Sequence, residues 1–568
     1  MKTFIKTGPL KNLIFFGILS FSLVSNAQDG LSDWGEYESV KQAAIQRINQ
    51  HRKGVVSIKV MLNDQEVAAN ATVKINQTRH DFLWGAVISR NFLDVPNTEV
   101  YQENLLKYFN ATGFTIALKP RWRNTNSESA AEDEMEWLLE NNFYVRGHAL
   151  TWEGYNFLRN EDRAIVDNPD LSPEEKGDLL LASLSQHFIH AIPKWEVPVW
   201  DVSNEPIDNN IVNDLFQNMD THAYWFRLAD SIRKVHGKED VLLYQNQYQV
   251  ISGTTNDALT LTKEGFQSVG RKALYAEIMD RQIAEGAKIE GIGFQSRLRA
   301  QWPRITPDSI YSRLRYFERF NLPMQATEFE LRDNEQNVFT LEERQILTEY
   351  MMVMYLSHPG INGFWHWTFS DIQPNAPTDY ALFNYDGTPK NNGIIWMNLM
   401  DNFFTTNEDL TSNASGETNA LAYHGTHDLT VEVDGQTYTG QFDVKEGSNT
   451  AIIVDLEDNE AVITFEEKEE TIVTSIDDQY LSESIQIRSN VSSSSIDIRI
   501  DDDLLKSNPL KLDLFDLQGK IIFSKQLRDP FTSIQSGSVP QNTILIARIS
   551  DLLTGQDLSR EKVIITGN

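Results

Sequence analysis

The sequence Trp200-Asp201-Val202-Ser203-Asn204-Glu205-Pro206 follows the apolar residues Val197 and Val199. An apolar run that turns polar in this way is typical of a buried strand that ends in a loop. A second stretch, Pro323-Met324-Gln325-Ala326-Thr327-Glu328-Phe329, repeats the arrangement. Each stretch places a glutamate at the expected end of its strand. We therefore expect Glu205 and Glu328 to lie on the same rim of a parallel α/β fold.

Between Phe82 and about Phe404, apolar strand-like runs alternate with longer helix-like runs. This alternation is typical of parallel α/β proteins, and its length favours a TIM (β/α)8 barrel over an open doubly wound sheet. No glycine-rich phosphate loop follows any of the expected strands, so a dinucleotide site has no support. The expected strands cover residues 82–88, 114–118, 144–150, 197–203, 241–246, 289–295, 323–328 and 363–369.

Two glutamates on one rim suit the hydrolysis of a glycosidic bond. One carboxylic acid protonates the leaving oxygen while the other carboxylate attacks the sugar or activates water. The usual role of a single glutamate is a helix cap or a salt bridge. That alternative is less favoured here because both glutamates end apolar strands and have similar neighbours.

The composition narrows the classes of partner. The chain has 568 residues, a net charge of −31 and no cysteine. The negative charge argues against binding to nucleic acid or to an anionic membrane. An anionic polysaccharide is also a poor match, unless a local basic cleft overrides the global field. The lack of cysteine excludes disulfides and cysteine metal sites, and neither a metal nor another cofactor is expected.

The N-terminus has the pattern of a secretory signal. Lys2, Lys6 and Lys11 precede the apolar run 13–24, and small residues up to Ala27 follow it. A membrane anchor is less favoured because a span needs about 20 apolar residues. We expect residues 1–27 to be removed after Ala27, no membrane span, and a protein that is secreted or held on the outer cell surface.

The expected domains follow from these changes of pattern. Residues 28–80 are predicted to form a helix and a β-hairpin collar, with strands 55–60 and 71–75 joined through Asn63-Asp64. Residues 81–405 form the barrel. Two all-β units follow, a small module at 406–475 and a sandwich-like unit at 476–568.

At the two glutamate motifs the sequence resembles glycoside hydrolase family 10, the retaining endo-β-1,4-xylanases. Three further stretches, Val145–Trp152, Gly291–Ser296 and Gly363–Trp367, resemble the third, sixth and eighth strands of that family. The resemblance implies that Glu205 is the acid/base and Glu328 the nucleophile. The expected substrate contacts are Lys119, His148, Trp152, Asn204, Asn246, Tyr248, Gln295, Arg297, Trp365 and Trp367. Of Trp365 and Trp367, at least one is expected to stack on sugar, and a core role for the other fits the pattern equally well.

Several positions depart from the family pattern. A Glu-Asn pair normally precedes the lysine of the second strand, but Thr115 and Ile116 lie before Lys119 here. Arg297 occupies the place of a histidine that orients the nucleophile. An arginine beside Glu328 would hold this carboxylate ionised and lower its pKa. The departures make the reaction type a firmer expectation than xylan itself.

The last 90 residues or so, including Leu514–Lys520, resemble the C-terminal sorting domain of the type IX secretion pathway, which implies contact with that machinery. A carbohydrate-binding module is the alternative, although this tail is poor in tryptophan and tyrosine. We expect a secreted retaining endo-glycosidase acting on β-1,4-xylan or a related β-glycan. The alternatives are the same mechanism on another polysaccharide, for example an algal one, and a non-catalytic glycan-binding barrel.

Overall fold

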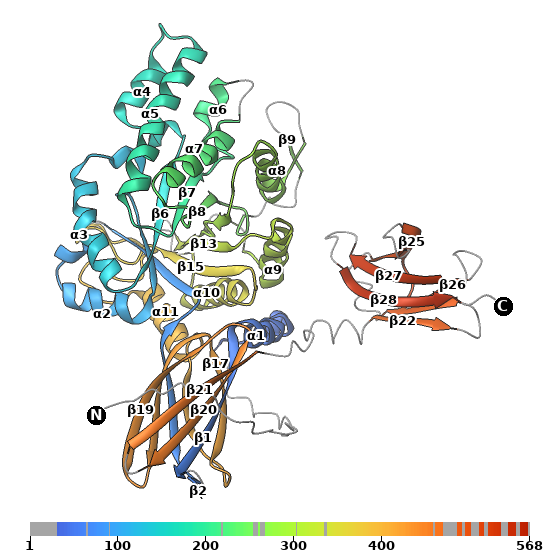
Figure 1. The fold of residues 1–568 in the computed structure, drawn as a ribbon. Coiled ribbons are helices and arrows are strands. Elements are labelled where there is room, and N and C mark those ends of the chain that lie inside the picture. The colour runs from blue at the N-terminus through green and yellow to red at the C-terminus, as the bar shows by residue number, and fades with distance from the viewer. Residues whose placement is uncertain are drawn as a thin grey trace. The chain divides into compact units, whose positions relative to one another are not determined.

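The computed structural model describes residues 31–469, except 64–65, 90, 217–219, 254–258, 262–266, 301, 303, 334–337 and 458–459. It also describes 485–490, 495–500, 510–515, 521–535, 543–551 and 557–565. The chain divides into two compact units, 1–469 and 470–568 (Figure 1). The expected signal peptide 1–27 and the motif around Asp516–Lys520 lie outside the described residues. In the described part of the chain, no helix is long and apolar enough to cross a membrane.

Eight parallel strands close into a barrel, which confirms the predicted TIM-barrel fold. The second strand is shorter and earlier than expected, because it ends at Phe114 and Lys119 lies in the loop that follows. The strands, in chain order, are β4 (Leu83–Ile88), β5 (Ala111–Phe114), β6 (Tyr144–Thr151), β7 (Val199–Asn204), β8 (Leu242–Gln247), β11 (Gly291–Phe294), β13 (Met324–Phe329) and β15 (Ile361–Trp367).

Helices surround the barrel. Two of them begin with a capping box, in which a hydroxyl side chain and a glutamate three residues later satisfy each other's backbone N–H groups. These are Ser172 with Glu175 and Thr340 with Glu343. The helices that follow the barrel strands are α2 (Thr98–Tyr108), α3 (Asn126–Glu140), α4 (Asn160–Asp167), α5 (Pro173–Lys194), α6 (Ile211–Leu215), α7 (Thr221–Val235), α8 (Gly270–Ala284), α9 (Pro307–Tyr316), α10 (Leu341–Leu356) and α11 (Asn391–Asn402).

The segments before and after the barrel combine into one β-sandwich, so the predicted hairpin of 55–60 with 71–75 is wrong. The two segments belong to different sheets, of order β17-β1-β20-β21 and β16-β3-β18-β19. A lone hairpin buries too little apolar surface to be stable. Here Ile58 and Val73 share a core with Leu429 and Val454. The strands are β1 (Lys53–Asn63), β2 (Glu66–Val67), β3 (Thr72–His80), β16 (Asn407–Thr411), β17 (Glu417–Tyr423), β18 (Gly425–Val433), β19 (Gln436–Val444), β20 (Ser448–Glu457) and β21 (Glu460–Glu469).

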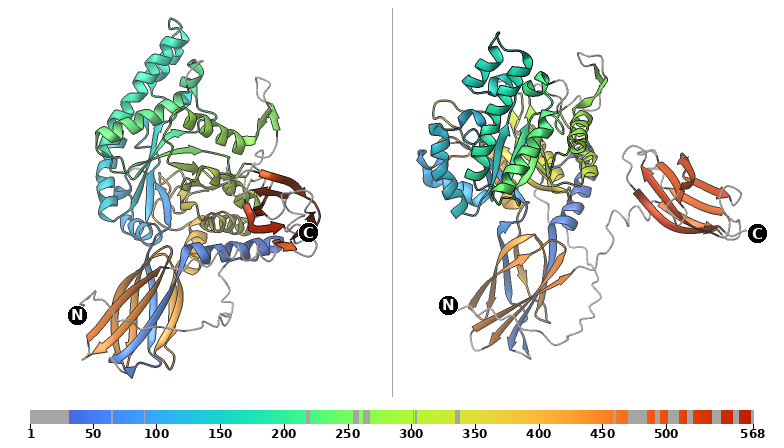
Figure 2. Two further views of the ribbon diagram at one scale, coloured as in Figure 1. Left: turned by 45° about the vertical axis from the view of Figure 1, so that its right-hand side comes forward. Right: turned by 45° about the horizontal axis from the view of Figure 1, so that its top comes forward.

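The sandwich packs against the end of the barrel where the strands begin (Figures 1 and 2). Arg52, the last residue of α1 (Glu38–Arg52), donates hydrogen bonds to the carbonyl oxygens of His358 (2.5 Å) and Ile361 (2.6 Å), before and at the start of β15. Asn110, just before β5, donates to the carbonyl oxygen of His80 at 2.6 Å. The rim that carries Glu205 and Glu328 is the opposite one, and the sandwich takes no part in it.

The second unit is all-β, as expected for residues 476–568. Its two sheets have the orders β22-β23-β26 and β25-β24-β27-β28, and they enclose a core of aliphatic side chains such as Ile498 and Leu512. The strands are β22 (Ile485–Asn490), β23 (Ser495–Ile500), β24 (Leu510–Phe515), β25 (Ile521–Leu527), β26 (Phe531–Gln535), β27 (Thr543–Asp551) and β28 (Asp557–Ile565).

Candidate active site

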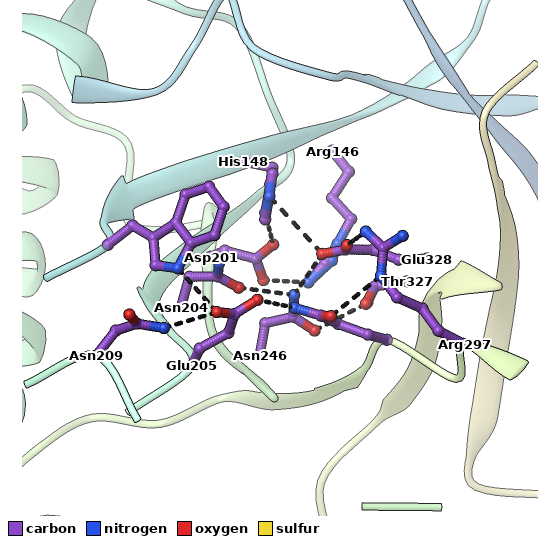
Figure 3. A network of polar contacts seen from close by, with 12 residues as sticks. Arg146, His148, Asp201, Asn204, Glu205, Asn209, Asn246, Arg297, Thr327 and Glu328 are labelled. Atoms are coloured by element: carbon purple, nitrogen blue, oxygen red, sulfur yellow. Dashed lines mark hydrogen bonds and ion pairs between the residues drawn. The ribbon is translucent and has the colours of Figure 1, made fainter. Parts of the chain in front are cut away.

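Glu205 and Glu328 lie at the carboxyl-terminal ends of β7 and β13, as predicted. Glu328 is within its strand and is 3% exposed. Glu205 directly follows β7 and has a left-handed backbone, with φ of 60°. Its N–H donates to the carbonyl oxygen of Asn246, at the neighbouring strand β8, at 2.8 Å. Figure 3 shows the two carboxylates converging on a shared set of polar side chains.

Three N–H donors contact the carboxylate of Glu205. Trp152 Nε1 and Asn209 Nδ2 both donate to Oε2, at 2.9 and 2.7 Å, and Gln295 Nε2 donates to Oε1 at 2.6 Å. Burial of this carboxyl and the charge of Glu328 raise its pKa above the usual value, although the donor from Gln295 opposes the shift. The raised pKa is what a general acid requires.

Glu328 has the opposite environment. Its burial acts to raise the pKa, but the positive charges of Arg297 and Lys119 help to bring the pKa below its usual value. Arg297 contacts Oε2 directly, and Asn246 Nδ2 donates to Oε1 at 3.0 Å. The ionised form is therefore favoured at Glu328, as a nucleophile requires.

Arg297 also connects the two carboxylates. Its Nε donates to Gln295 Oε1 at 3.2 Å, and the amide of Gln295 donates to Glu205. Its remaining terminal nitrogen lies 2.7 Å from a carboxylate oxygen of the buried Glu330. One guanidinium thus orients Glu328 directly and Glu205 through one intervening amide.

His148 is held by a buried ion pair that the sequence analysis did not assign to the site. Asp201 contacts Arg146 through one carboxylate oxygen and His148 Nδ1 through the other, at 2.7 Å. His148 Nε2 then faces Glu328 Oε1 at 3.7 Å. Burial and the charge of Lys119 lower the pKa of His148, so the imidazole is neutral near pH 7.

Asn204 and Asn246 lie on the neighbouring strands β7 and β8, next to the two carboxylates. Asn246 Nδ2 donates to Asn204 Oδ1 at 3.0 Å, and Asn246 Oδ1 accepts from Thr327 at 2.7 Å. The first of these hydrogen bonds fixes the orientation of the Asn204 amide, because Oδ1 must accept and Nδ2 must then be the donor.

Aromatic rings and cations line the remaining side. The Lys119 ammonium lies 4.6 Å from the ring centroid of Trp152 and 5.3 Å from that of Trp367. Among the described residues, Lys119 forms no hydrogen bond or ion pair through its ammonium. Tyr248 follows β8 under the guanidinium of Arg271, at 4.2 Å, and burial raises its pKa to about 12.

Trp365 lies in the barrel interior below the rim. Its side chain is completely buried, and its Nε1 donates to the carbonyl oxygen of Thr112 at 3.2 Å. Successive side chains of a strand point to opposite faces. Trp365 and Trp367 are two residues apart, so both point inward. Trp365 fills the barrel interior where Gly85 leaves room for it, while Trp367 lies nearer the rim beside Arg297 (4.7 Å).

Asn209 is the functional candidate that the sequence analysis missed. It lies in the loop after β7, and its N–H also donates to the Glu205 carbonyl oxygen at 3.0 Å. A Cβ on Gly154 would lie 2.1 Å from Asn209 Oδ1, so a glycine is required there for the amide to reach Glu205. The four-residue spacing from Glu205 was the only signal in the sequence.

A (β/α)8 barrel with two carboxylates of opposed pKa on its carboxyl-terminal rim has the architecture of a glycoside hydrolase. Residues 75–393, more than half of the chain, match the sequence model of glycosyl hydrolase family 10. The chain belongs to this family.

Individual relatives are distant. The chain is 23% identical over 412 residues to endo-1,4-beta-xylanase 2 of Arabidopsis thaliana. The aligned region makes up 71% of the chain and 35% of that protein. It is 24% identical over 421 residues, 72% of the chain, to the anti-sigma-I factor RsgI6 of Acetivibrio thermocellus, of which it covers 49%. The chain thus spans a third to a half of these curated relatives.

Solved structures also match. Xylanase 10B from Thermotoga petrophila, in complex with xylobiose, aligns with 56% of the chain and 94% of its own at 19% identity, with a TM-score of 0.45.

Proposed function

We propose that this protein is a retaining endo-glycosidase that hydrolyses β-1,4-xylan or a related β-glycan. The observation that carries the proposal is the opposed environment of the two carboxyl groups. Burial raises the pKa of Glu205, whereas the charges of Arg297 and Lys119 lower the pKa of Glu328. Two titratable groups whose pKa values are driven apart are suited to separate acid and nucleophile roles.

The reaction then has two steps. Glu328 attacks the anomeric carbon while Glu205 donates its proton to the leaving oxygen, which gives a glycosyl-enzyme intermediate. Glu205, now ionised, takes a proton from water, and this water displaces Glu328 from the sugar. Trp152, Asn209 and Gln295 stabilise the ionised Glu205 between the two steps, since all three donate to its oxygens.

The substrate contacts follow from the same geometry. In this proposal Asn204 donates to a sugar hydroxyl beside the anomeric centre, and Gln295 and His148 contact the reacting ring. The Lys119 ammonium and the Trp367 ring lie next to each other and border the site on the side of Glu328. Thr115 and Ile116 precede Lys119 and cannot supply the hydrogen bonds of a Glu-Asn pair. This difference favours a second candidate, the same mechanism on a different polysaccharide.

A non-catalytic glycan-binding barrel is the third candidate. One relative, which aligns with 72% of the chain, is named an anti-sigma factor and not a xylanase. The retained carboxylate pair, with its complete set of hydrogen-bond donors, favours catalysis.

The deciding experiment is reducing-sugar release from xylan, mixed-linkage glucan, mannan and algal polysaccharides. The unaltered chain is compared with Glu328→Ala, and Glu342→Ala, an exposed glutamate in the first turn of α10, serves as the matched control. Release that disappears in Glu328→Ala alone supports the hydrolase and identifies its glycan. No release from any polysaccharide, with binding retained, contradicts the hydrolase and supports the binding protein.

We also propose that the chain is exported, through the basic and apolar N-terminus and the C-terminal all-β unit. Fusion of residues 1–27 and 470–568 to a reporter, expressed in a bacterium with type IX secretion, tests this. A reporter retained inside the cell contradicts the proposal.

A further inference from the structure

Two short strands extend the barrel outward from the nucleophile. β12 (Leu298–Arg299) follows Arg297, and β14 (Leu331–Arg332) follows Glu330. They pair in parallel, with Leu298 opposite Leu331 and Arg299 opposite Arg332. The two leucines are buried, so the two arginines share the other face of this extension.

Three arginines lie along this extension, and the carboxylate of Asp379, which accepts from the N–H of Asp333, lies beside it. Arg297 and Arg299 both contact the buried Glu330, at 2.7 and 3.4 Å. Arg332 has no carboxylate partner among the described residues. The next acid along the chain, Asp333, is occupied by Arg344 at 2.5 Å and by the N–H groups of Val338 and Phe339.

The arginines also lie on aromatic rings. The Arg299 guanidinium lies 5.3 Å from the ring centroid of Trp302, and that of Arg332 lies 4.9 Å from Tyr380. The Nε–H of Arg299 is buried and has no hydrogen-bond partner in the part of the chain that the structure describes. Burial and the neighbouring Arg297 and Arg332 charges lower the pKa of Arg299, with Glu330 opposing them. A bound anion would offset this crowding of positive charge.

We propose that Arg299 and Arg332 form a subsite for an anionic group on the polysaccharide, either the carboxylate of a uronic acid or a sulfate ester. The proposal rests on the assignment of the cleft as a glycan site, and it names the class of glycan. A planar guanidinium binds either group through paired N–H donors, and rings beside it stack on sugar faces. The net charge of −31 opposes an acidic polymer elsewhere on the protein, so the local arginines must supply the attraction.

The test compares binding to matched polymers. The full chain carries Glu205→Gln, which blocks proton transfer and leaves the Arg297–Glu328 contact in place. Affinity gel electrophoresis measures its dissociation constants for glucuronoxylan and for the same polymer after carboxyl reduction. A second pair is a sulfated algal polysaccharide and its desulfated form.

We expect one acidic polymer to bind about tenfold more tightly than its neutral counterpart, and the pair that shows this identifies the anion. Arg332→Gln and Arg299→Gln should each bring the ratio close to one. Arg319→Gln, an exposed arginine paired with Asp280, is the control and should keep the ratio. High salt should remove the preference, because it screens charges. This salt measurement needs no arginine variant to fold.

Ratios near one for both polymer pairs overturn the subsite, as does a ratio that survives in folded Arg332→Gln. Turnover by the unaltered chain is measured separately on the same polymers. Hydrolysis without a charge preference overturns only the subsite, whereas a preference without hydrolysis overturns only the proposed enzyme.

Discussion

The two carboxylate oxygens of Glu205 accept hydrogen bonds from different residues. Trp152 and Asn209 donate to Oε2, whereas only Gln295 donates to Oε1. A carboxylate oxygen has two lone pairs, so Oε2 is fully occupied and the proton of the acid form belongs on Oε1. The donors on Oε2 stabilise the ionised form and limit how far burial raises the pKa.

Replacing Asn209 by alanine should therefore raise the pKa of Glu205 further. The acid must be protonated in the first step, so the alkaline limb of the kcat/KM profile should move to higher pH. The kcat should fall about tenfold, because a less stable carboxylate makes Glu205 a weaker proton donor to the leaving oxygen. Asn160→Ala, on the outer helix α4, is the control. An alkaline limb that stays in place or moves to lower pH would show that Asn209 has only a structural role.

Arg297 should control the opposite limb. Its charge lowers the pKa of Glu328, so Arg297→Gln should raise that pKa and move the acid limb of kcat/KM to higher pH. Arg297→Lys keeps the charge and should restore most of the shift, although it cannot bridge to Gln295 and Glu330 at once. Identical acid limbs in the unaltered chain and in Arg297→Gln would contradict this role.

At the scale of elements, local patterns indicated the strands but not their partners. The runs that became β6 and β7 were recognisable because parallel barrel strands are apolar and end in polar residues. The alternation in β1 was also visible, but its neighbour β20 lies far along the chain, with Val56 opposite Thr450. An alternating pattern shows which face of a strand is buried and carries no information about which strand covers it.

The sequence pattern also could not predict how far each side chain lies from the rim. Trp365 and Trp367 could not be separated by pattern, because both precede the rim on one strand. The tightness of the barrel interior decides, since Gly85 makes room for Trp365. Asn209 was missed because a loop places it, and loop geometry has no periodicity to read.

The shared sandwich makes a prediction about its elements. Ile58 of β1 is 1% exposed in the sandwich core. Ile58→Ala should lower the free energy of unfolding by about 2–5 kcal/mol, through lost burial and the cavity left behind. Ser57→Ala, on the exposed face of the same strand, is the control. Urea unfolding measures both, and equal stability of the two variants would contradict the shared core.

For the whole molecule, the junction of sandwich and barrel should make stability sensitive to acid. His424 and His427 are buried there and His80 is half-buried, and desolvation lowers the pKa of each, that of His427 to about 4. An unfolded histidine titrates near 6.5. The unfolded state therefore binds more protons below that pH, and stability is lost as the pH falls from about 6.5 towards 4.

Glu134 and Glu153 act in the opposite direction, because burial raises the pKa of each to about 8. The change in stability of the unaltered chain with pH is therefore the difference between the histidine and the glutamate contributions. A histidine variant isolates the first of these. His427→Gln should have a Tm that falls less between pH 7 and pH 4.5 than the Tm of the unaltered chain, as measured by calorimetry. The exposed His236→Gln should follow the unaltered chain. A steeper fall in His427→Gln would mean that this histidine is charged in the folded protein, and that the junction tolerates a proton which burial should exclude.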